Sequence, residues 1–194
     1  LGVNGGTLTG RVDGRIVDAE VKAHAIRERK AAFAGEGGLA VALGDGANDV
    51  GAQWIDAMPR KGGLSAARML SQPMKALLLL DVEPLLDGAN PSAARAALDA
   101  SGLVVALTPF SDVAADYADV MLPIAPFAET SGSFVNAEGR LQSFHGVTKP
   151  RGEARPAWKV LRVLGNLLGV AGFDHETSES VRDEAVKLAG PIEQ

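Results

Sequence analysis

The chain has 194 residues, of which 46% are hydrophobic and 22% charged, a composition that favours a folded core over disorder. The formal net charge is −5 and no run is rich in Lys or Arg, which argues against nucleic acid as a partner. The absence of cysteine excludes disulfides and cysteine-ligated zinc or iron–sulfur clusters within these residues, and apolar runs such as residues 76–80 are far shorter than the roughly 20 residues that span a bilayer.

The first fifty residues predict a hairpin, a helix and a strand, in that order. Residues 7–17 alternate apolar and polar side chains, which is typical of a β-hairpin or of two short strands. Asp18 can cap a helix over residues 19–34, a segment rich in Ala, Glu, Lys and Arg. The apolar run over residues 39–43 has the composition of a buried parallel strand.

The rest of the chain alternates strands and helices. Strands of the buried parallel type are predicted over residues 76–80, 104–107 and 120–124. Helices are predicted over residues 50–58, 65–71, 91–100, 156–169 and 179–188. Asn90 is the expected N-cap of the helix between the first two strands, and Pro91 suits its first position. This order predicts an α/β fold with a parallel-sheet βαβ body and C-terminal helices, preceded by the small hairpin–helix–strand segment.

A first group of polar residues surrounds the loop Gly44-Asp45-Gly46-Ala47-Asn48-Asp49. Together with Leu8-Thr9-Gly10-Arg11-Val12 and Lys22-Ala23, this loop resembles phosphoserine phosphatase of the haloacid dehalogenase superfamily. The resemblance implies that Asp45 and Asp49 hold Mg²⁺ through carboxylate oxygens and that Lys22 neutralises a phosphoryl group. That superfamily attacks phosphate with an aspartate of an Asp-x-Asp motif, which this chain lacks. The loop also suits an ordinary strand-to-helix turn whose polar residues cap the following helix, so both interpretations stay open.

A second group is the segment Glu129-Thr130-Ser131-Gly132-Ser133-Phe134-Val135-Asn136-Ala137-Glu138-Gly139-Arg140. It can present backbone N–H groups and a guanidinium to a polar ligand or to another polypeptide. The segment resembles the C-terminal signature of the molybdopterin oxidoreductase family, and more closely that of the family's member in NADH-quinone oxidoreductase (complex I, the respiratory NADH dehydrogenase). Further matching segments extend over residues 48–184 and include Gly62-Gly63-Leu64-Ser65, Lys149-Pro150 and Arg155-Pro156-Ala157-Trp158-Lys159.

The resemblance implies a position near the cofactor end of the domain for Glu129, Gly132, Asn136, Glu138, Gly139 and Arg140. In the complex I member of the family the fold persists without a molybdenum centre, and electrons pass through iron–sulfur clusters of Cys-rich N-terminal domains. We therefore expect no catalytic residue and no cofactor in this chain. The Glu/Arg pair and Asn136 are expected to tie the loop down, while the α/β body braces the peripheral arm of complex I.

The same resemblance gives expectations for organisation, partners and location. It divides the chain into a phosphatase-like segment over residues 1–50, a molybdopterin-oxidoreductase-like fragment over residues 51–188 and a tail over residues 189–194. We expect the chain to be a fragment whose partners are other peripheral-arm subunits of complex I. Neither nucleic acid nor a direct membrane span is expected, and the expected location is cytoplasmic, peripheral to the inner membrane.

Three functional interpretations stay open. The chain is a structural part of complex I, a Mg²⁺-dependent phosphoserine phosphatase-like hydrolase that needs a nucleophile the chain lacks, or a molybdopterin-binding module that needs a further half to complete the cofactor cleft. Single residues also have plainer interpretations. Glu138 and Arg140 suit a surface ion pair, Trp158 suits a core position, and His145 suits an ordinary loop.

Overall fold

The computed structural model describes residues 2–4, 7–9, 11–12, 15–16, 48–57, 59, 62–136 and 139–191. The predicted helix over residues 19–34 and the predicted strand over residues 39–43 lie outside these ranges. The chain divides into two compact units, which we describe separately. The first comprises residues 1–58, 133–143 and 185–194, and the second comprises residues 59–132 and 144–184. The predicted domain boundaries after residues 50 and 188 stay a prediction.

In the first unit, four short strands form two antiparallel pairs. β1 (Gly2–Asn4) pairs with β2 (Thr7–Thr9), and β3 (Arg11–Val12) pairs with β4 (Arg15–Ile16). The alternating segment therefore forms strands, as predicted. The difference is that β2 pairs with β1, which lies before the predicted hairpin.

The first unit also contains α2 (Asp49–Trp54), which ends before the predicted residue 58. The cause is local, because Asp56 has a φ angle of 56° and a right-handed helix cannot include that conformation. The indole Nε1 of Trp54 donates a hydrogen bond to the carbonyl oxygen of Gly190 at 2.9 Å. This bond ties the end of α2 to the last described residues of the chain.

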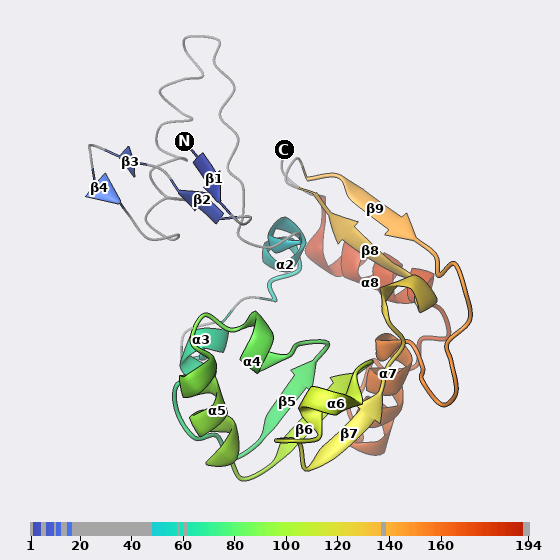
Figure 1. Ribbon diagram of the computed structural model, residues 1–194. Helices are drawn as coiled ribbons and strands as arrows, with labels where there is room; N and C mark the ends of the chain where they lie inside the picture. The colour runs from blue at the N-terminus through green and yellow to red at the C-terminus, as the bar shows by residue number, and fades with distance from the viewer. Residues whose placement is uncertain are drawn as a thin grey trace. The chain divides into compact units, whose positions relative to one another are not determined.

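The second unit is built on a three-stranded parallel sheet with the strand order β5-β6-β7 (Figure 1). These strands span Leu77–Leu80, Val104–Thr108 and Val120–Pro123. In the register, Leu77 lies beside Val104, and Val105 lies beside Val120. The predicted strands and the predicted βαβ arrangement are confirmed.

The other elements complete the chain order. They are α3 (Ala66–Met69), α4 (Pro84–Asp87), α5 (Pro91–Asp99), α6 (Ser111–Ala114), the 3-10 turn η2 (Phe127–Glu129), β8 (Gly132–Val135), β9 (Leu141–Phe144), α7 (Ala157–Leu167) and α8 (Ser178–Ala189). Helices α3, α5, α7 and α8 match predicted helices. The Asn90 side chain accepts a hydrogen bond from Ala93 N at 3.0 Å, as expected of the N-cap. The short elements α4, α6, η2, β8 and β9 were not predicted.

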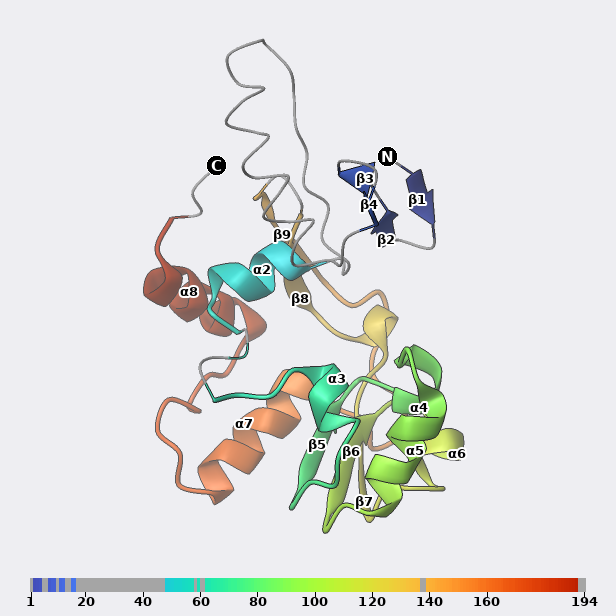
Figure 2. The same cartoon turned by 90° about the vertical axis from the view of Figure 1, so that its left-hand side faces the viewer.

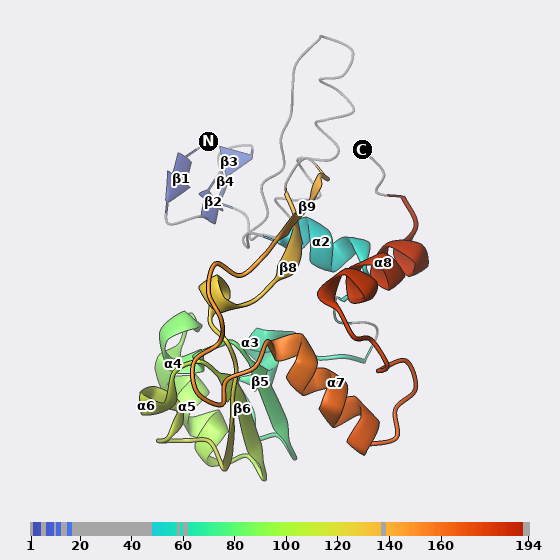
Figure 3. The ribbon, with the colours of Figure 1, turned by 90° about the vertical axis from the view of Figure 1, so that its right-hand side faces the viewer.

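The main core lies on one face of this sheet. Its buried members are Leu77, Leu79, Leu98, Val104, Ala106 and Ala114. Successive side chains of a strand point to opposite faces, so Leu78 and Leu80 lie on the other face, where they are 51% and 44% exposed. Figures 2 and 3 show α4, α5 and α6 on one side of the sheet and α7 on the other. Within the described residues, no helix is both long enough and apolar enough to cross a membrane.

Candidate functional site

In the second unit, the η2 turn packs against the loop that follows β9. The rings of Phe127 and Phe144 stack with their centroids 4.6 Å apart. The backbone N–H of Val147 donates a hydrogen bond to the carbonyl oxygen of Ala128 at 2.8 Å. Gly146 permits this close approach, because a Cβ atom there would lie 3.0 Å from the nearest backbone atom of η2. Packing therefore fixes the first half of the loop singled out from the sequence.

Two of the predicted cofactor-side residues lie in this half. The Oε2 atom of Glu129 accepts a hydrogen bond from Arg151 N at 3.0 Å, so its carboxylate is anchored to the backbone of a second loop. Gly132 begins β8, and a Cβ atom there would lie 2.9 Å from Cζ of Phe144. Both residues therefore stabilise the loop within the second unit: Glu129 through its hydrogen bond to Arg151, and Gly132 by leaving room for the ring of Phe144.

An open depression of about 370 Å³ lies beside this loop and the first residues of α7 and α8. Its acidic side chains are Glu129, Glu176 and Glu179. Its basic side chains are Lys149, Lys159 and His145. Lysine binds anionic groups as a point charge, and carboxylates accept hydrogen bonds from N–H donors. The depression thus suits a ligand that carries both an anionic group and N–H groups.

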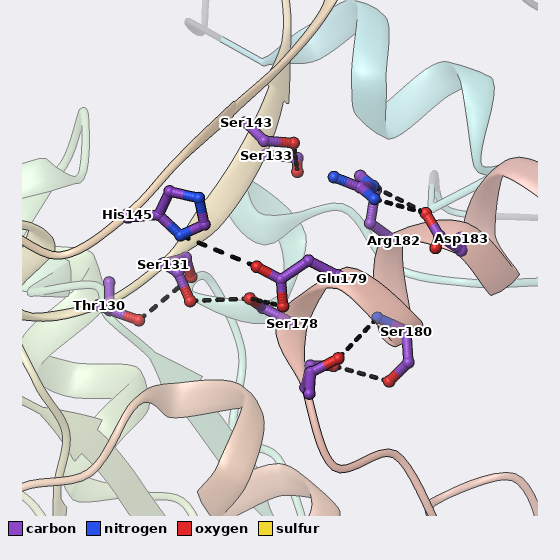
Figure 4. Close-up of polar contacts among 11 residues, drawn as sticks. Thr130, Ser131, Ser133, Ser143, His145, Ser178, Glu179, Ser180, Arg182 and Asp183 are labelled. Atoms are coloured by element: carbon purple, nitrogen blue, oxygen red, sulfur yellow. Dashed lines mark hydrogen bonds and ion pairs between the residues drawn. The ribbon is translucent and has the colours of Figure 1, made fainter.

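Hydroxyl and carboxylate groups that line the depression are linked by a series of hydrogen bonds (Figure 4). Ser178 Oγ donates to Glu179 Oε2 at 3.2 Å and lies 2.8 Å from Ser131 Oγ. A serine hydroxyl has a single proton, so the proton between the two serines belongs to Ser131, which donates to Ser178. The contact joins the predicted loop to the start of α8, 47 positions along the chain.

Hydrogen bonds hold the carboxylate of Glu179 at the start of α8. Its pKa is lowered because its carboxylate accepts hydrogen bonds from its own backbone N–H and from the Ser178 hydroxyl, with a further contribution from the charge of His145. His145 Nδ1 lies 3.8 Å from Glu179 Oε1, and the histidine side chain is 77% exposed. The residue that the sequence suggested was an ordinary loop histidine therefore lies at the rim, opposite a carboxylate.

Trp158 lies at the N-terminal end of α7 and lines the same depression. The residue is only partly buried and is not among the buried core residues, so the predicted core position is not confirmed. The Nε1 atom is fully buried and has no hydrogen-bond partner among the described residues. Buried polar groups normally have a partner, so this indole N–H is an exception among the described residues, and its burial shields it from the open depression. Lys159 Nζ lies 5.3 Å from the centre of the same ring, within the range of a cation–π contact.

The second half of the predicted loop belongs to the first unit, at the turn between β8 and β9. Asn136 Oδ1 accepts a hydrogen bond from Arg140 N at 2.9 Å, and Gly139 N donates to Asn136 O at 3.0 Å. Gly139 has a φ angle of 80°, which favours glycine. Asn136 thus closes this turn, while the predicted Glu138 lies outside the described residues. A cofactor-binding role for these residues stays a prediction.

Asn48 is a structural residue that sequence reasoning did not assign. Its Oδ1 atom accepts a hydrogen bond from Val135 N at 2.7 Å, within the first unit. The only indication of this role in the sequence was that Asn48 lies in the polar loop before α2. Ser178 and Glu179 were also not singled out, although a polar residue followed by an acid is a typical helix start.

The predicted Mg²⁺ and phosphate residues lie largely outside the described ranges. Lys22 and Asp45 are not among the described residues, and for Asp49 only the backbone, as the first residue of α2, is described. In the part of the chain that the structure describes, no group of three or more His, Asp or Glu side chains is arranged to hold a metal ion. Metal binding at Asp45 and Asp49 stays a prediction.

The parallel sheet, its connecting helices and the polar depression define the class of protein: an α/β domain with a ligand-sized polar site beside its loops. The chain matches the model of the family described as Molybdopterin oxidoreductase over residues 13–167. The chain therefore belongs to the molybdopterin oxidoreductase family. The match starts within the segment that resembles phosphoserine phosphatase, and the comparisons do not show that second resemblance.

Curated relatives agree with the family. The chain is 31% identical over 140 residues to "Probable oxidoreductase YjgC" of Bacillus subtilis, an alignment that covers 70% of this chain and 14% of that protein. It is 32% identical over 99 residues to a "Putative formate dehydrogenase" of Staphylococcus aureus strain bovine RF122, which covers 51% of this chain and 10% of the relative. The chain thus spans a small part of the relatives it matches. These relatives do not show the complex I member of the family specifically.

Proposed function

We propose that the chain is a cofactor-side module of a larger molybdopterin oxidoreductase of the formate dehydrogenase-like kind. The observation that carries this proposal is the family match over residues 13–167, together with the names of the relatives. The loop over residues 129–140 would face the cofactor, as its resemblance implies. The chain itself would contribute no catalytic residue, and its task would be to position one wall of the site.

The residues of the depression fit the cofactor of this family, which joins a phosphate to an amino-substituted heterocycle. Lys149 and Lys159 would hold the anionic phosphate, while Glu129 and Glu179 would accept from N–H groups of the heterocycle. When bound, the cofactor supplies two-electron redox chemistry. We propose that the open depression does not retain it without the rest of the oxidoreductase.

A structural role in complex I is the second candidate. It is favoured by the complex I-like segments such as Arg155-Pro156-Ala157-Trp158-Lys159 and by the absence of cysteine ligands. In that case the partners would be peripheral-arm subunits on the cytoplasmic side of the inner membrane, with iron–sulfur clusters in the parent subunit. The phosphatase-like hydrolase is not advanced, because no observation on the described residues favours it.

Purification of the tagged chain from its own host separates the two candidates. We expect molybdenum and formate-dependent dye reduction to co-purify with the chain. NADH dehydrogenase subunits without molybdenum would support complex I, and the absence of both would overturn the proposal.

A pair of variants tests the depression itself. The double variant Lys149→Glu and Lys159→Glu should lose the co-purified molybdenum, because it removes both lysines that line the depression. Lys187→Glu is the matched control, since this lysine lies in the last turn of α8 and does not line the depression. Equal molybdenum in all three proteins would contradict the assignment of the depression.

A further inference from the structure

A second hollow of about 520 Å³ lies along α7 and shares Lys159 with the lining of the depression. We call it the α7 groove. Its floor is apolar, formed by Leu122 of β7 and by side chains of α7 that include Val163 and Leu167. Val163 is 48% exposed and Leu167 is 80% exposed. A continuous apolar hollow of this kind is a typical mark of an interaction site.

The apolar stripe of α7 follows the spacing of a helix-packing surface. Val160, Val163, Leu164 and Leu167 recur at intervals of three and four residues, which places them on one side of the helix. The buried side of α7 is used elsewhere, because Gly165 packs against the ring of Phe173. Within the described residues, this stripe is therefore a second apolar surface of α7.

The rim of the groove is positively charged. Its described lining residues include Arg155, Lys159 and Arg162 and no acidic residue. This is the opposite of the chain as a whole, whose net charge is −5. Arg162 Nη1 donates to the carbonyl oxygen of His175 at 3.1 Å, but its buried Nε has no acceptor in the part of the chain that the structure describes. Because the described lining carries basic side chains and no acidic one, the groove suits an occupant that brings carboxylate groups.

We propose that the α7 groove binds an acidic amphipathic helix from a neighbouring part of the larger oxidoreductase. Apolar side chains of that helix pack on the stripe of α7, and its carboxylates face Arg155 and Arg162. The 11 residues of α7 extend for about 16 Å, which sets a length of roughly three turns for the contact. The occupant rests on the proposed function, in which this chain is one module of a longer oxidoreductase.

Charge complementarity and helix geometry favour this occupant over a second copy of the chain. A second copy would bring the same basic rim to the groove and place like charges opposite each other. The test uses a fluorescently labelled synthetic helix with a leucine face and glutamate flanks as its probe. The matched control peptide has lysine in place of every glutamate.

We expect the acidic peptide to bind and the basic peptide to bind at least about tenfold more weakly. Arg155→Glu, which changes a residue that lines the groove and not the depression, should reverse this preference, and Leu167→Gln should weaken both peptides by about tenfold. Leu167 is exposed, so its substitution leaves the fold intact, which circular dichroism checks. Lys187→Glu, on α8 and outside the groove's lining, should change neither affinity.

Equal affinity for the two peptides would overturn the proposal. Self-association of the chain in sedimentation that Leu167→Gln abolishes would also overturn it, because the occupant would then be a second copy. The peptide assay uses the isolated chain and needs neither molybdenum nor formate. Its failure would therefore leave the co-purification result untouched, and failure of the co-purification would leave the groove's peptide preference measurable.

Discussion

At strand β5, the two faces of the central sheet differ in how far the described residues cover them, whereas Leu107 on the α7 face of the central strand β6 is 0% exposed. On the face of α5 and α6, Leu77 and Leu79 are 6% and 7% exposed and belong to one continuous core. On the face of α7, Leu78 and Leu80 are 51% and 44% exposed, although they alternate with the buried leucines on the same strand. Parallel sheets are normally covered on both faces. An apolar strand pattern therefore predicts that both faces of a strand are suited to burial. It does not predict whether other elements of the described chain pack against each face.

Substitution of neighbouring leucines gives the largest expected effect and tests the contrast between the faces directly. Leu79→Ala should lower the free energy of unfolding by about 2–5 kcal/mol, because it leaves a cavity in the core. Leu78→Ala on the same strand should cost less than about 1 kcal/mol, since the side chain is half exposed. Urea denaturation of both variants measures the two values. Similar losses would mean that the α7 face is covered as fully as the other.

The cap of α5 should give a smaller effect on the covered face. Asn90→Ala removes the acceptor for Ala93 N and should cost about 1 kcal/mol of stability. Asn90→Asp keeps an acceptor at the cap and is the matched control. If the alanine variant unfolded at the same urea concentration as the wild type, α5 would not depend on its cap to hold the core.

The smallest effect concerns pH and the exposed polar contacts of α8. The folded-state pKa of Glu179 is lowered from its ordinary value of 4.5, so its contribution to stability is present above that value and is lost as the pH falls through the folded-state pKa. Glu179→Gln should therefore lower the stability slightly at neutral pH and leave it nearly unchanged below the folded-state pKa, which flattens the acid side of the stability curve. Thermal melts between about pH 7 and pH 3 measure the curve. An unchanged slope would contradict the lowered folded-state pKa of Glu179, which its own backbone N–H and then the Ser178 hydroxyl bring about.

Sequence periodicity sufficed for the sheet and the longer helices of the second unit. The runs over residues 76–80, 104–107 and 120–124 form β5, β6 and β7, because buried parallel strands read as continuous apolar runs. The end of α2 was missed, since no pattern of side chains announces the left-handed backbone of Asp56.

The candidate site was harder to predict than the fold. The resemblance picked out Glu129 and Gly132, but it could not show that Arg151 and Phe144 fix them, because these contacts join distant parts of the chain. Likewise, Ser131 and Ser178 are ordinary polar residues in the sequence, and only the tertiary structure makes them hydrogen-bonded neighbours. The specific resemblance to complex I was finer than the comparisons support, since the matching segments belong to the wider family.

The two tryptophans of the chain lie in different compact units. Trp54 donates its indole N–H to Gly190 in the first unit, whereas Trp158 lines the depression in the second, where its N–H has no acceptor among the described residues. Indole emission responds to hydrogen bonding and to nearby charge, so the two residues act as separate optical reporters. A Trp54→Phe protein would emit from the depression alone, and ligand entry there could be followed without a label. A Trp158→Phe protein would report only on the unit that contains α2.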